Sequence, residues 1–304
     1  MVKTNAAKLV EISVQGKVAN PFHRGMFFVD DKGVPFALPG TGGITYNVKV
    51  GDPAFGWAGD HIEPAASTCA NEKDRGGFVN AAYNFYSCIG NEAVVINGDA
   101  KGSKGTVTGH HGGIEHVLVD FPDVALKKMD LDSKVLIRAC GQGLEFSDYP
   151  EIKIMNVSPV LLKKLGIKEN KKDGSISVPV THVVPGKLMG SGIGSITPHK
   201  GDYDIMTQDK AMVEKHGLDS LRFGDVVAIT DHDNSYGRTF QSGAVTIGVV
   251  IHSDCLKAGH GPGVSNIITC RTSKIKPVLD KNANIGKYLG IGRFKDKKTN
   301  KKKK

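Results

Sequence analysis

The stretch NEAVVINGDAKGSKGTVTGHHGGIEHVLVDFPD, residues 91–123, decides the fold. An apolar run at 94–96 leads into glycine-rich turns, and a second apolar run follows at 117–121. Runs rich in β-branched residues and separated by glycine-rich turns are typical of short antiparallel strands joined by hairpins. The stretch therefore predicts a set of adjacent antiparallel strands.

The segments on either side repeat this pattern. Residues 9–18 and 26–52 alternate apolar runs with turns, and residues 243–251 are apolar on both faces, which is typical of a central strand. The 38 glycines and 13 prolines favour short strands, and short helices are expected only at 158–167 and 209–217. We therefore expect a mostly β protein with small barrels, including an SH3-type barrel, and few short helices.

The length of 304 residues is long for one compact domain, so the chain is divided on its pattern. We expect an N-terminal β domain at 1–90 and an SH3-type barrel at 91–150. A C-terminal mostly β domain is expected at 151–292, followed by a disordered lysine-rich tail at 293–304.

Positive charge is concentrated in the tail. The net charge is +9, but residues 293–304 hold eight of the 40 basic residues and one of the 31 acidic residues. The remaining 292 residues carry 32 basic and 30 acidic side chains, so the folded body is nearly neutral. A basic tail attracts nucleic acid in a salt-dependent way, but a solubilising extension explains it equally simply. We therefore expect a small-molecule partner before a nucleic acid.

The five cysteines favour a reducing compartment, because their number is odd and their spacing matches no zinc motif. The N-terminus has no apolar core of signal-peptide length, and the apolar run at 243–251 is too short to span a bilayer. We expect a cytoplasmic protein without a membrane partner. The glycine-rich residues 184–195 match neither a phosphate loop nor a dinucleotide-binding fingerprint, which argues against nucleotide binding.

A first candidate site lies in ITDHDNSYGR, residues 229–238. Alternation along a strand end would place Asp231 and Asp233 on one side, as a divalent metal ion or acid/base catalysis requires. Arg238 and Tyr236 could orient an anionic substrate. An Asp-rich turn that bonds its own backbone explains the same residues, so both interpretations stay open.

A second candidate lies in HSDCLKAGHGPG, residues 252–263, at the exit of the apolar strand. His252 and His260 are the predicted catalytic residues, and Asp254 is predicted to bind substrate together with His61 from the loop at 60–63. Cys255 is more simply explained as a buried small apolar residue than as a nucleophile.

The histidines of the opening stretch, His110, His111 and His116, surround a Gly-Gly turn. Glu115 and His116 are neighbours on a strand and point to opposite faces, so at most His110 or His111 can join one of them in binding a metal. A hydrated turn with one functional histidine is the simpler interpretation.

Two resemblances add to these patterns. Residues 91–123 resemble the KOW motif of small SH3-type barrels, which implies a barrel and allows RNA or protein binding. With GDHIEPAAS, PGKLMGSGIG, GDYDI, SYGR and GAVTIGVVIHSDCLKAGHGPG, the chain up to about residue 275 resembles the bacterial and archaeal family "domain of unknown function 4438". This resemblance implies a mostly β fold and no particular reaction. The family pattern leads us to expect a glycine at position 65 and a larger residue at position 66, where this chain has Ala65 and Ala66.

Three hypotheses follow for the function. The first is an enzyme or binding protein for a small polar or anionic metabolite, with metal-dependent hydrolysis or elimination as its reaction. Its cleft would combine the segments 60–63, 231–238 and 252–260, with a divalent metal ion on Asp231 and Asp233. The second is a nucleic-acid or ribosome-associated binding module that uses the KOW-like barrel and the tail. The third is a structural homo-oligomer without catalysis.

Overall fold

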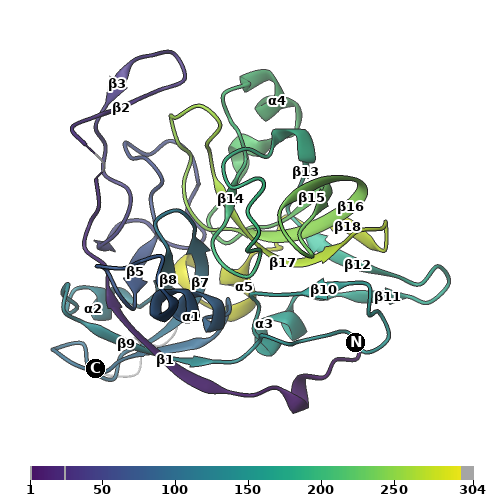
Figure 1. The fold of residues 1–304 in the computed structure, drawn as a ribbon, viewed down its shortest axis with the longest axis horizontal. Helices are drawn as coiled ribbons and strands as arrows, with labels where there is room; N and C mark the ends of the chain where they lie inside the picture. The colour runs from purple at the N-terminus through teal and green to yellow at the C-terminus, as the bar shows by residue number, and fades with distance from the viewer. Residues whose placement is uncertain (1, 24, 296–304) are drawn as a thin grey trace, which may run out of the picture.

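The structure is a computed structural model that describes residues 2–23 and 25–295. Six antiparallel strands form a closed barrel in the order β1-β9-β6-β7-β8-β5, and the pairing of β1 with β5 closes it (Figure 1). Its strands are β1 (Ile12–Val18), β5 (Ala65–Cys69), β6 (Glu92–Val95), β7 (Lys104–His111), β8 (His116–Asp120) and β9 (Lys134–Ala139). The short strand β4 (Ile44–Thr45) extends the sheet beyond β5.

Alternation of side chains fills the barrel. In β9, Val135, Ile137 and Ala139 are buried, whereas the residues between them are exposed. Full closure leaves no unpaired strand edge, which stabilises a small sheet in water. The mostly β fold with a barrel is thus confirmed, and the stretch 91–123 supplies its neighbouring strands β6, β7 and β8. The predicted boundary at residue 90 falls inside this barrel, because closure requires β1 and β5.

The C-terminal half is built on a second sheet in the order β10-β17-β16-β15-β13, with β14 paired to β17. Its strands are β10 (Lys153–Ile154), β13 (His182–Pro185), β14 (Tyr203–Asp204), β15 (Val226–Asp233), β16 (Thr239–Val250) and β17 (Gly263–Cys270). The apolar strand expected to be central is β16, which lies between β15 and β17.

Smaller elements complete the fold. Three strands form a separate sheet, β11 (Lys168–Asn170), β12 (Ser175–Val180) and β18 (Ile275–Leu279), and two form a hairpin, β2 (Phe28–Val29) and β3 (Pro35–Phe36). The α-helices are α1 (Phe78–Tyr86), α2 (Asp123–Leu126), α3 (Pro159–Lys164), α4 (Lys210–Lys215) and α5 (Ile285–Leu289). The 3-10 helices are η1 (Ala6–Lys8), η2 (Gly186–Leu188), η3 (Leu218–Ser220) and η4 (Gly292–Phe294). Within the described residues, no helix combines the length and apolar character needed to cross a membrane.

The helices at 158–167 and 209–217 form as expected. Ser158 accepts a hydrogen bond from the backbone N–H of Leu161 at the start of α3, and Gly217 follows α4 in a left-handed conformation with φ 62°. The tail predicted at 293–304 lies mostly outside the described residues.

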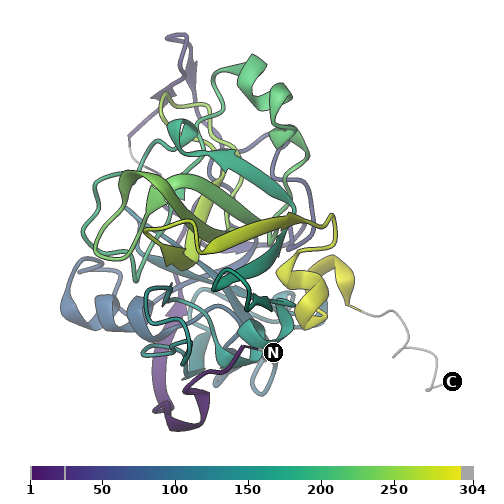
Figure 2. The same ribbon diagram turned by 90° about the vertical axis from the view of Figure 1, so that its right-hand side faces the viewer.

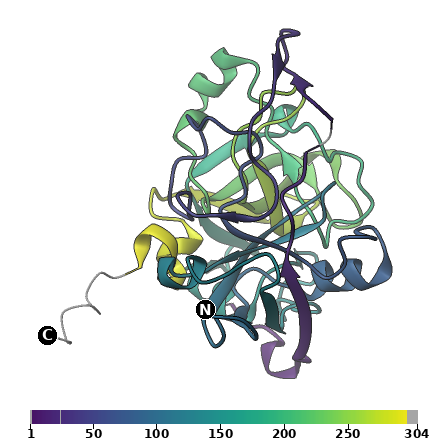
Figure 3. The ribbon, with the colours of Figure 1, turned by 90° about the vertical axis from the view of Figure 1, so that its left-hand side faces the viewer.

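The barrel and the second sheet pack directly on each other. The backbone N–H of His110 in β7 donates to Ser265 Oγ in β17 at 3.1 Å, and the Ser265 hydroxyl donates to the His110 carbonyl at 3.0 Å. One apolar core contains Leu118 of the barrel together with Ile247 and Ile267 of the second sheet. Figures 2 and 3 show the second sheet stacked against the barrel, and the β2–β3 hairpin standing away from the barrel on the side of that sheet. The ends of β7 and β16 therefore meet at this junction.

Candidate metal centre

Four histidines gather at the junction of the barrel and the second sheet. His111 ends β7, His252 follows β16, His260 precedes β17, and His61 lies in the loop before β5. The ring centroids of His111 and His252 are 4.4 Å apart, and His61 lies 4.9 Å from His252 and 5.0 Å from His260. Segments nearly 200 residues apart in sequence are thus brought into ring contact.

The loop that carries His61 has an unusual backbone. His61 and Ala65 adopt left-handed conformations with φ 52° and φ 62°. Each such residue costs on the order of 1 kcal/mol, and such conformations concentrate at functional sites. At position 65, where the family resemblance led us to expect a glycine, the chain thus has the backbone that glycine favours. The two turns bracket Glu63 and direct its side chain into the junction.

In three of the histidines, the Nδ1 atom is already engaged by an oxygen. Nδ1 of His111 donates to Glu63 at 2.5 Å, and Nδ1 of His61 donates to Asp60 at 2.8 Å. Nδ1 of His252 lies 2.8 Å from the Ser253 carbonyl oxygen and 3.3 Å from the Gly263 nitrogen. In the neutral rings that bind a metal, this arrangement favours the proton on Nδ1 and leaves Nε2 as the lone-pair donor. Histidines that bind metals are typically held in this way.

Glu63 anchors this arrangement from inside the protein. Its carboxylate is fully buried and accepts hydrogen bonds from His111, His116, the Ser67 hydroxyl and the Gly42 N–H. Burial opposes its ionisation, but the two histidines outweigh that effect and hold the pKa of Glu63 well below its usual range. The same balance holds for Asp60: burial opposes its ionisation, but the hydrogen bond to His61 lowers its pKa to about 2.

Asp204 of β14 and Asp202, which directly precedes this strand, complete the cluster. Nε2 of His252 lies 2.9 Å from Asp202 Oδ2 and 3.5 Å from Asp204 Oδ1. Despite this proximity, His252 Nε2 and Asp202 Oδ2 are buried without a hydrogen-bond partner among the described residues. Two buried polar atoms that lie close but are not aligned with each other suit a shared third partner.

The charges of these groups favour a cation. Burial opposes ionisation of Asp202, Asp204 and His252, but their mutual attraction prevails. The pKa of each aspartate is lowered, and that of His252 is raised well above its usual range. Without a metal, a proton on His252 therefore balances part of the carboxylate charge, and a metal would have to displace it.

Three overlapping groups of residues have ligand atoms within 4.8 Å of one another: Asp202, Asp204 and His252; His61, His111 and His252; and His61, Cys255 and His260. Imidazole nitrogens and carboxylate oxygens are the donors that Zn²⁺, Mn²⁺ and Fe²⁺ take in catalytic sites. The orphaned buried atoms, the fixed tautomers and the donor set therefore all fit a divalent transition-metal ion.

A pocket of about 380 Å³ opens beside the cluster. Its walls include His61, His111, Asp202, Asp204 and His260, with Lys200, Lys257 and Arg238. Arg238 is only 4% exposed; its Nη2 donates to the Lys200 carbonyl at 2.9 Å, and its Nε has no partner among the described residues. A buried guanidinium with free donors next to a metal site suits an anionic ligand.

The structure brings together about half of the residues predicted from sequence. His61, His252, His260 and Arg238 all lie at the cluster or its pocket. Tyr236 is 79% exposed and is not among the residues that line the pocket. Asp254 also lies off the pocket, where its carboxylate accepts hydrogen bonds from Thr207 Oγ1 and its neighbour's N–H.

Asp231 and Asp233 do not join the cluster. A β-bulge between Thr230 and His232, with Asp231 at φ 56°, breaks the alternation that was expected to place the two aspartates on one side. Asp231 accepts a hydrogen bond from the Gly243 N–H. Asp233 accepts from Ser235 and pairs with Arg271 at 3.3 Å. The structure therefore gives both aspartates local partners, as in the Asp-rich turn of the alternative interpretation.

The histidines of 110–116 are buried and do not form a hydrated turn. His110 donates to the Ser87 carbonyl, away from the cluster, whereas His111 and His116 converge on Glu63. As the strand geometry required, only one of His110 and His111 shares a partner with His116. Sequence reasoning missed Asp202 and Asp204, although the alternating pattern Asp-Tyr-Asp was the signal that could have found them.

Comparisons with known proteins agree with the fold. The models of the N-terminal and C-terminal parts of "Domain of unknown function (DUF4438)" match residues 27–163 and 164–289. A solved structure, "Crystal structure of TM1086", is 49% identical with a TM-score of 0.89, and the match covers 95% of this chain and 99% of that chain. None of the curated proteins matches the chain. The resemblance expected from the motifs is confirmed: the chain belongs to the family described as domain of unknown function 4438.

Proposed function

We propose that the protein is a metal-dependent enzyme that acts on a small anionic substrate by hydrolysis or elimination. The observation that carries this proposal is the set of three histidines whose Nδ1 atoms are engaged, of which His252 and His61 direct Nε2 toward Asp202 and Asp204 beside a pocket. A bound divalent ion would supply Lewis-acid activation of the substrate or of a water molecule.

The remaining groups of the pocket suit the steps that such a reaction requires. Arg238 is positioned to bind a carboxylate or phosphate group of the substrate, and Lys200, which pairs with Glu115 at 3.3 Å, also lines the pocket. His260 is the most exposed imidazole of the cluster, with 23% of its side chain accessible, and its Nδ1 lies 3.0 Å from Asp204. With a single ion bound, His260 would exchange protons between substrate and solvent.

Metal content is the first test. The full chain, with and without added Zn²⁺ or Mn²⁺, would be desalted and its metal measured by plasma mass spectrometry, together with the variant His252→Ala. The double variant Asp231→Asn/Asp233→Asn is the matched control, because its carboxylates lie outside the cluster. We expect stoichiometric metal in the wild type and the control, and its loss in His252→Ala. A wild type that retains no metal from either solution would overturn the proposal.

The nucleic-acid alternative has less support. It relies on the KOW-like likeness of residues 91–123 and on Lys101 and Lys104 of the barrel. Lys104 pairs with Glu92 at 3.1 Å, which partly neutralises its charge. Binding of RNA that persists at physiological salt and is lost in Lys101→Ala would favour this alternative.

Cytoplasmic localisation and assembly into a homo-oligomer also stay proposals. All five cysteines are free thiols, which supports a reducing compartment. Fractionation of cells that express the protein, and light scattering of the purified chain, would test the two.

A further inference from the structure

The cluster has more candidate ligands than one ion can bind, and they are spread over a longer distance than one coordination sphere. Its three groups of residues overlap in His252 and His61 but remain separate groups, so they form a chain of donors. Asp202 stands at one end of this chain, and Cys255 and His260 stand at the other. A single ion accepts about four to six ligands at roughly 2.0–2.3 Å, so it cannot reach both ends.

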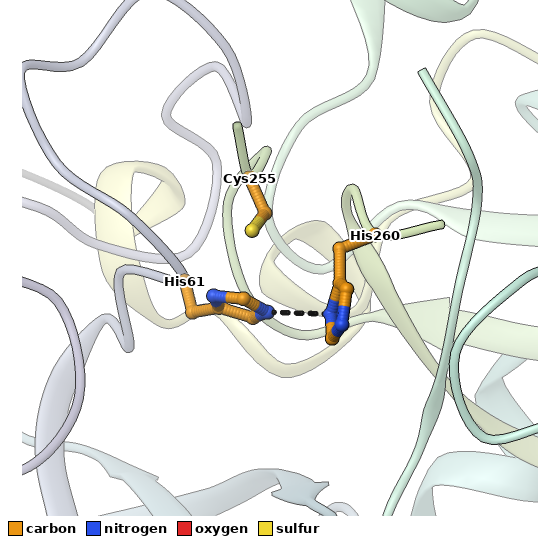
Figure 4. Close-up of side chains that lie close together, drawn as sticks. All are labelled: His61, Cys255 and His260. Atoms are coloured by element: carbon orange, nitrogen blue, oxygen red, sulfur yellow. Dashed lines mark hydrogen bonds between the residues drawn. The ribbon is translucent and has the colours of Figure 1, made fainter. Parts of the chain in front are cut away.

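The end formed by Cys255 and His260 has the donors of a metal site of its own. In Figure 4, Cys255 and His260 come from the loop before β17 and meet His61 from the opposite side, with the cysteine sulfur turned toward the rings. His61 Nε2 lies 3.1 Å from His260 Nδ1. Either nitrogen can donate to the other or both can bind one cation, and the buried thiol beside them suits the second arrangement.

Asp204 connects the two ends. Its Oδ1 faces His252 Nε2 at 3.5 Å, and its Oδ2 faces His260 Nδ1 at 3.0 Å and His61 Nε2 at 3.7 Å. Each oxygen of this carboxylate thus faces a different set of nitrogens. A carboxylate that bridges two metal ions divides its oxygens in the same way.

The buried charge also favours bound cations. Asp60, Glu63, Asp202 and Asp204 are each at most 7% exposed and surround the same four imidazoles. Histidines that bind metal are neutral, so the four carboxylates then carry negative charge that the buried Arg238 and the pairing of Glu63 with His116 offset only in part. Divalent ions bound at the cluster would offset the remaining negative charge.

We infer that the centre binds two divalent ions of the zinc class, bridged by Asp204. The first ion lies on Asp202, Asp204 and His252, with His111 beside His252 as a further imidazole. The second lies on His61, His260 and Cys255, whose thiol proton passes to solvent when the sulfur binds. The inference rests on the proposed metal centre and adds a second ion at about 3.5–4 Å from the first, the usual spacing of two-metal sites.

The test is the number of Zn²⁺ ions bound per chain, measured by native mass spectrometry on the full chain titrated with Zn²⁺. We expect two ions in the wild type and one in both Cys255→Ala and His260→Ala. Cys270→Ala is the matched control, because Cys270 is also a buried free thiol but lies in the core of the second sheet. The control should keep two ions.

Each outcome separates this inference from the proposed function. One ion in the wild type, lost in His252→Ala, would refute the second ion and leave the metal-dependent enzyme intact. Two ions in both Cys255→Ala and His260→Ala would refute the assignment of the second ion to these residues. No ion in the wild type would refute both proposals.

A spectroscopic readout covers variants that do not fold. Wild-type protein loaded with Co²⁺ should show the near-ultraviolet charge-transfer absorption of a cobalt–thiolate bond, because Cys255 is the cysteine in the cluster. A wild type that binds two Co²⁺ ions without this absorption would contradict the role of Cys255.

Discussion

Replacing Glu63 by glutamine tests how the cluster is held together. Glu63 accepts four hydrogen bonds with two oxygens, and glutamine keeps one acceptor and replaces the other with an N–H₂ donor. In either orientation of the amide, donors of the protein would face the donors of the glutamine. The variant Glu63→Gln therefore leaves buried polar groups unsatisfied without changing the volume of the side chain.

The magnitude follows from the bonds that are lost. Two hydrogen bonds to a buried charge, at about 1.5 kcal/mol each, give a loss of about 3 kcal/mol in the free energy of unfolding. If the Glu63 oxygen that orients His111 becomes an amide, His111 also loses the partner that fixes its tautomer. Loss of such a partner usually weakens metal binding by about 10–100-fold.

Two measurements separate the effects on stability and on metal binding. Urea unfolding of the metal-free protein gives the change in stability, and competition with a chromophoric chelator gives the Kd for Zn²⁺. Glu92→Gln is the control, because the side chain of Glu92 is exposed and pairs with Lys104. We expect this variant to change the free energy of unfolding by less than about 0.5 kcal/mol. A Glu63→Gln variant that loses stability but binds Zn²⁺ within about twofold of the wild type would refute the role of His111 as a ligand.

Three further predictions concern other parts of the molecule. Burial raises the pKa of Asp120 from 3.8 to about 6, so its ionisation destabilises the fold as the pH rises from about 4 to 6. In urea unfolding, the free energy of unfolding of Asp120→Asn should therefore rise by about 3 kcal/mol relative to that of the wild type between pH 4 and pH 7. Parallel pH profiles of the two proteins would contradict this. Arg238→Lys loses the planar fork of donors and should weaken the binding of phosphate to the metal-loaded protein by about tenfold in calorimetry, whereas an unchanged Kd would exclude Arg238 from the anion site. A Cβ at Gly263 would lie 1.9 Å from Asp202 Oδ2 and 2.2 Å from His252 Nε2, so Gly263→Ala should remove the ion bound at these two residues. A zinc content equal to that of the wild type would show that these two atoms are not ligands.

Local patterns predicted the strands, the two capped helices and several residues of the site. The central position of β16 followed from its two apolar faces, and the strand-end argument pointed to His252. The helix α1 (Phe78–Tyr86) was not predicted, because its ends lack the usual capping signals: Gly77 stands at the N-cap and provides no side-chain hydrogen bond. Its position is decided by tertiary contacts, such as the packing of Tyr83 into the barrel core.

The aspartates show why local patterns could not identify the whole site. The pattern Asp-x-Asp occurs at 202–204 and at 231–233, and the argument from strand alternation applies equally to both. The difference lies in long-range pairing. Residues 203 and 204 pair with β17 beside His252, whereas a bulge at Asp231 turns its carboxylate toward Gly243. Neither the two-residue strand β14 nor the bulge has a strong local signal, so sequence reasoning selected the pair that lies outside the cluster.

The origin of the ligands links the centre to the folding of the whole chain. His61 and His111 belong to the part matched by the N-terminal family model, whereas Asp202, Asp204, His252 and His260 belong to the C-terminal part. Neither part has the complete donor set, because His111 and its anchor Glu63 lie in the first, and both aspartates lie in the second. A bound metal would therefore connect the two parts in the same place as the hydrogen bonds between His110 and Ser265. Since a ligand that binds only the folded state stabilises it, metal binding at this junction would also stabilise the packing of the barrel against the second sheet.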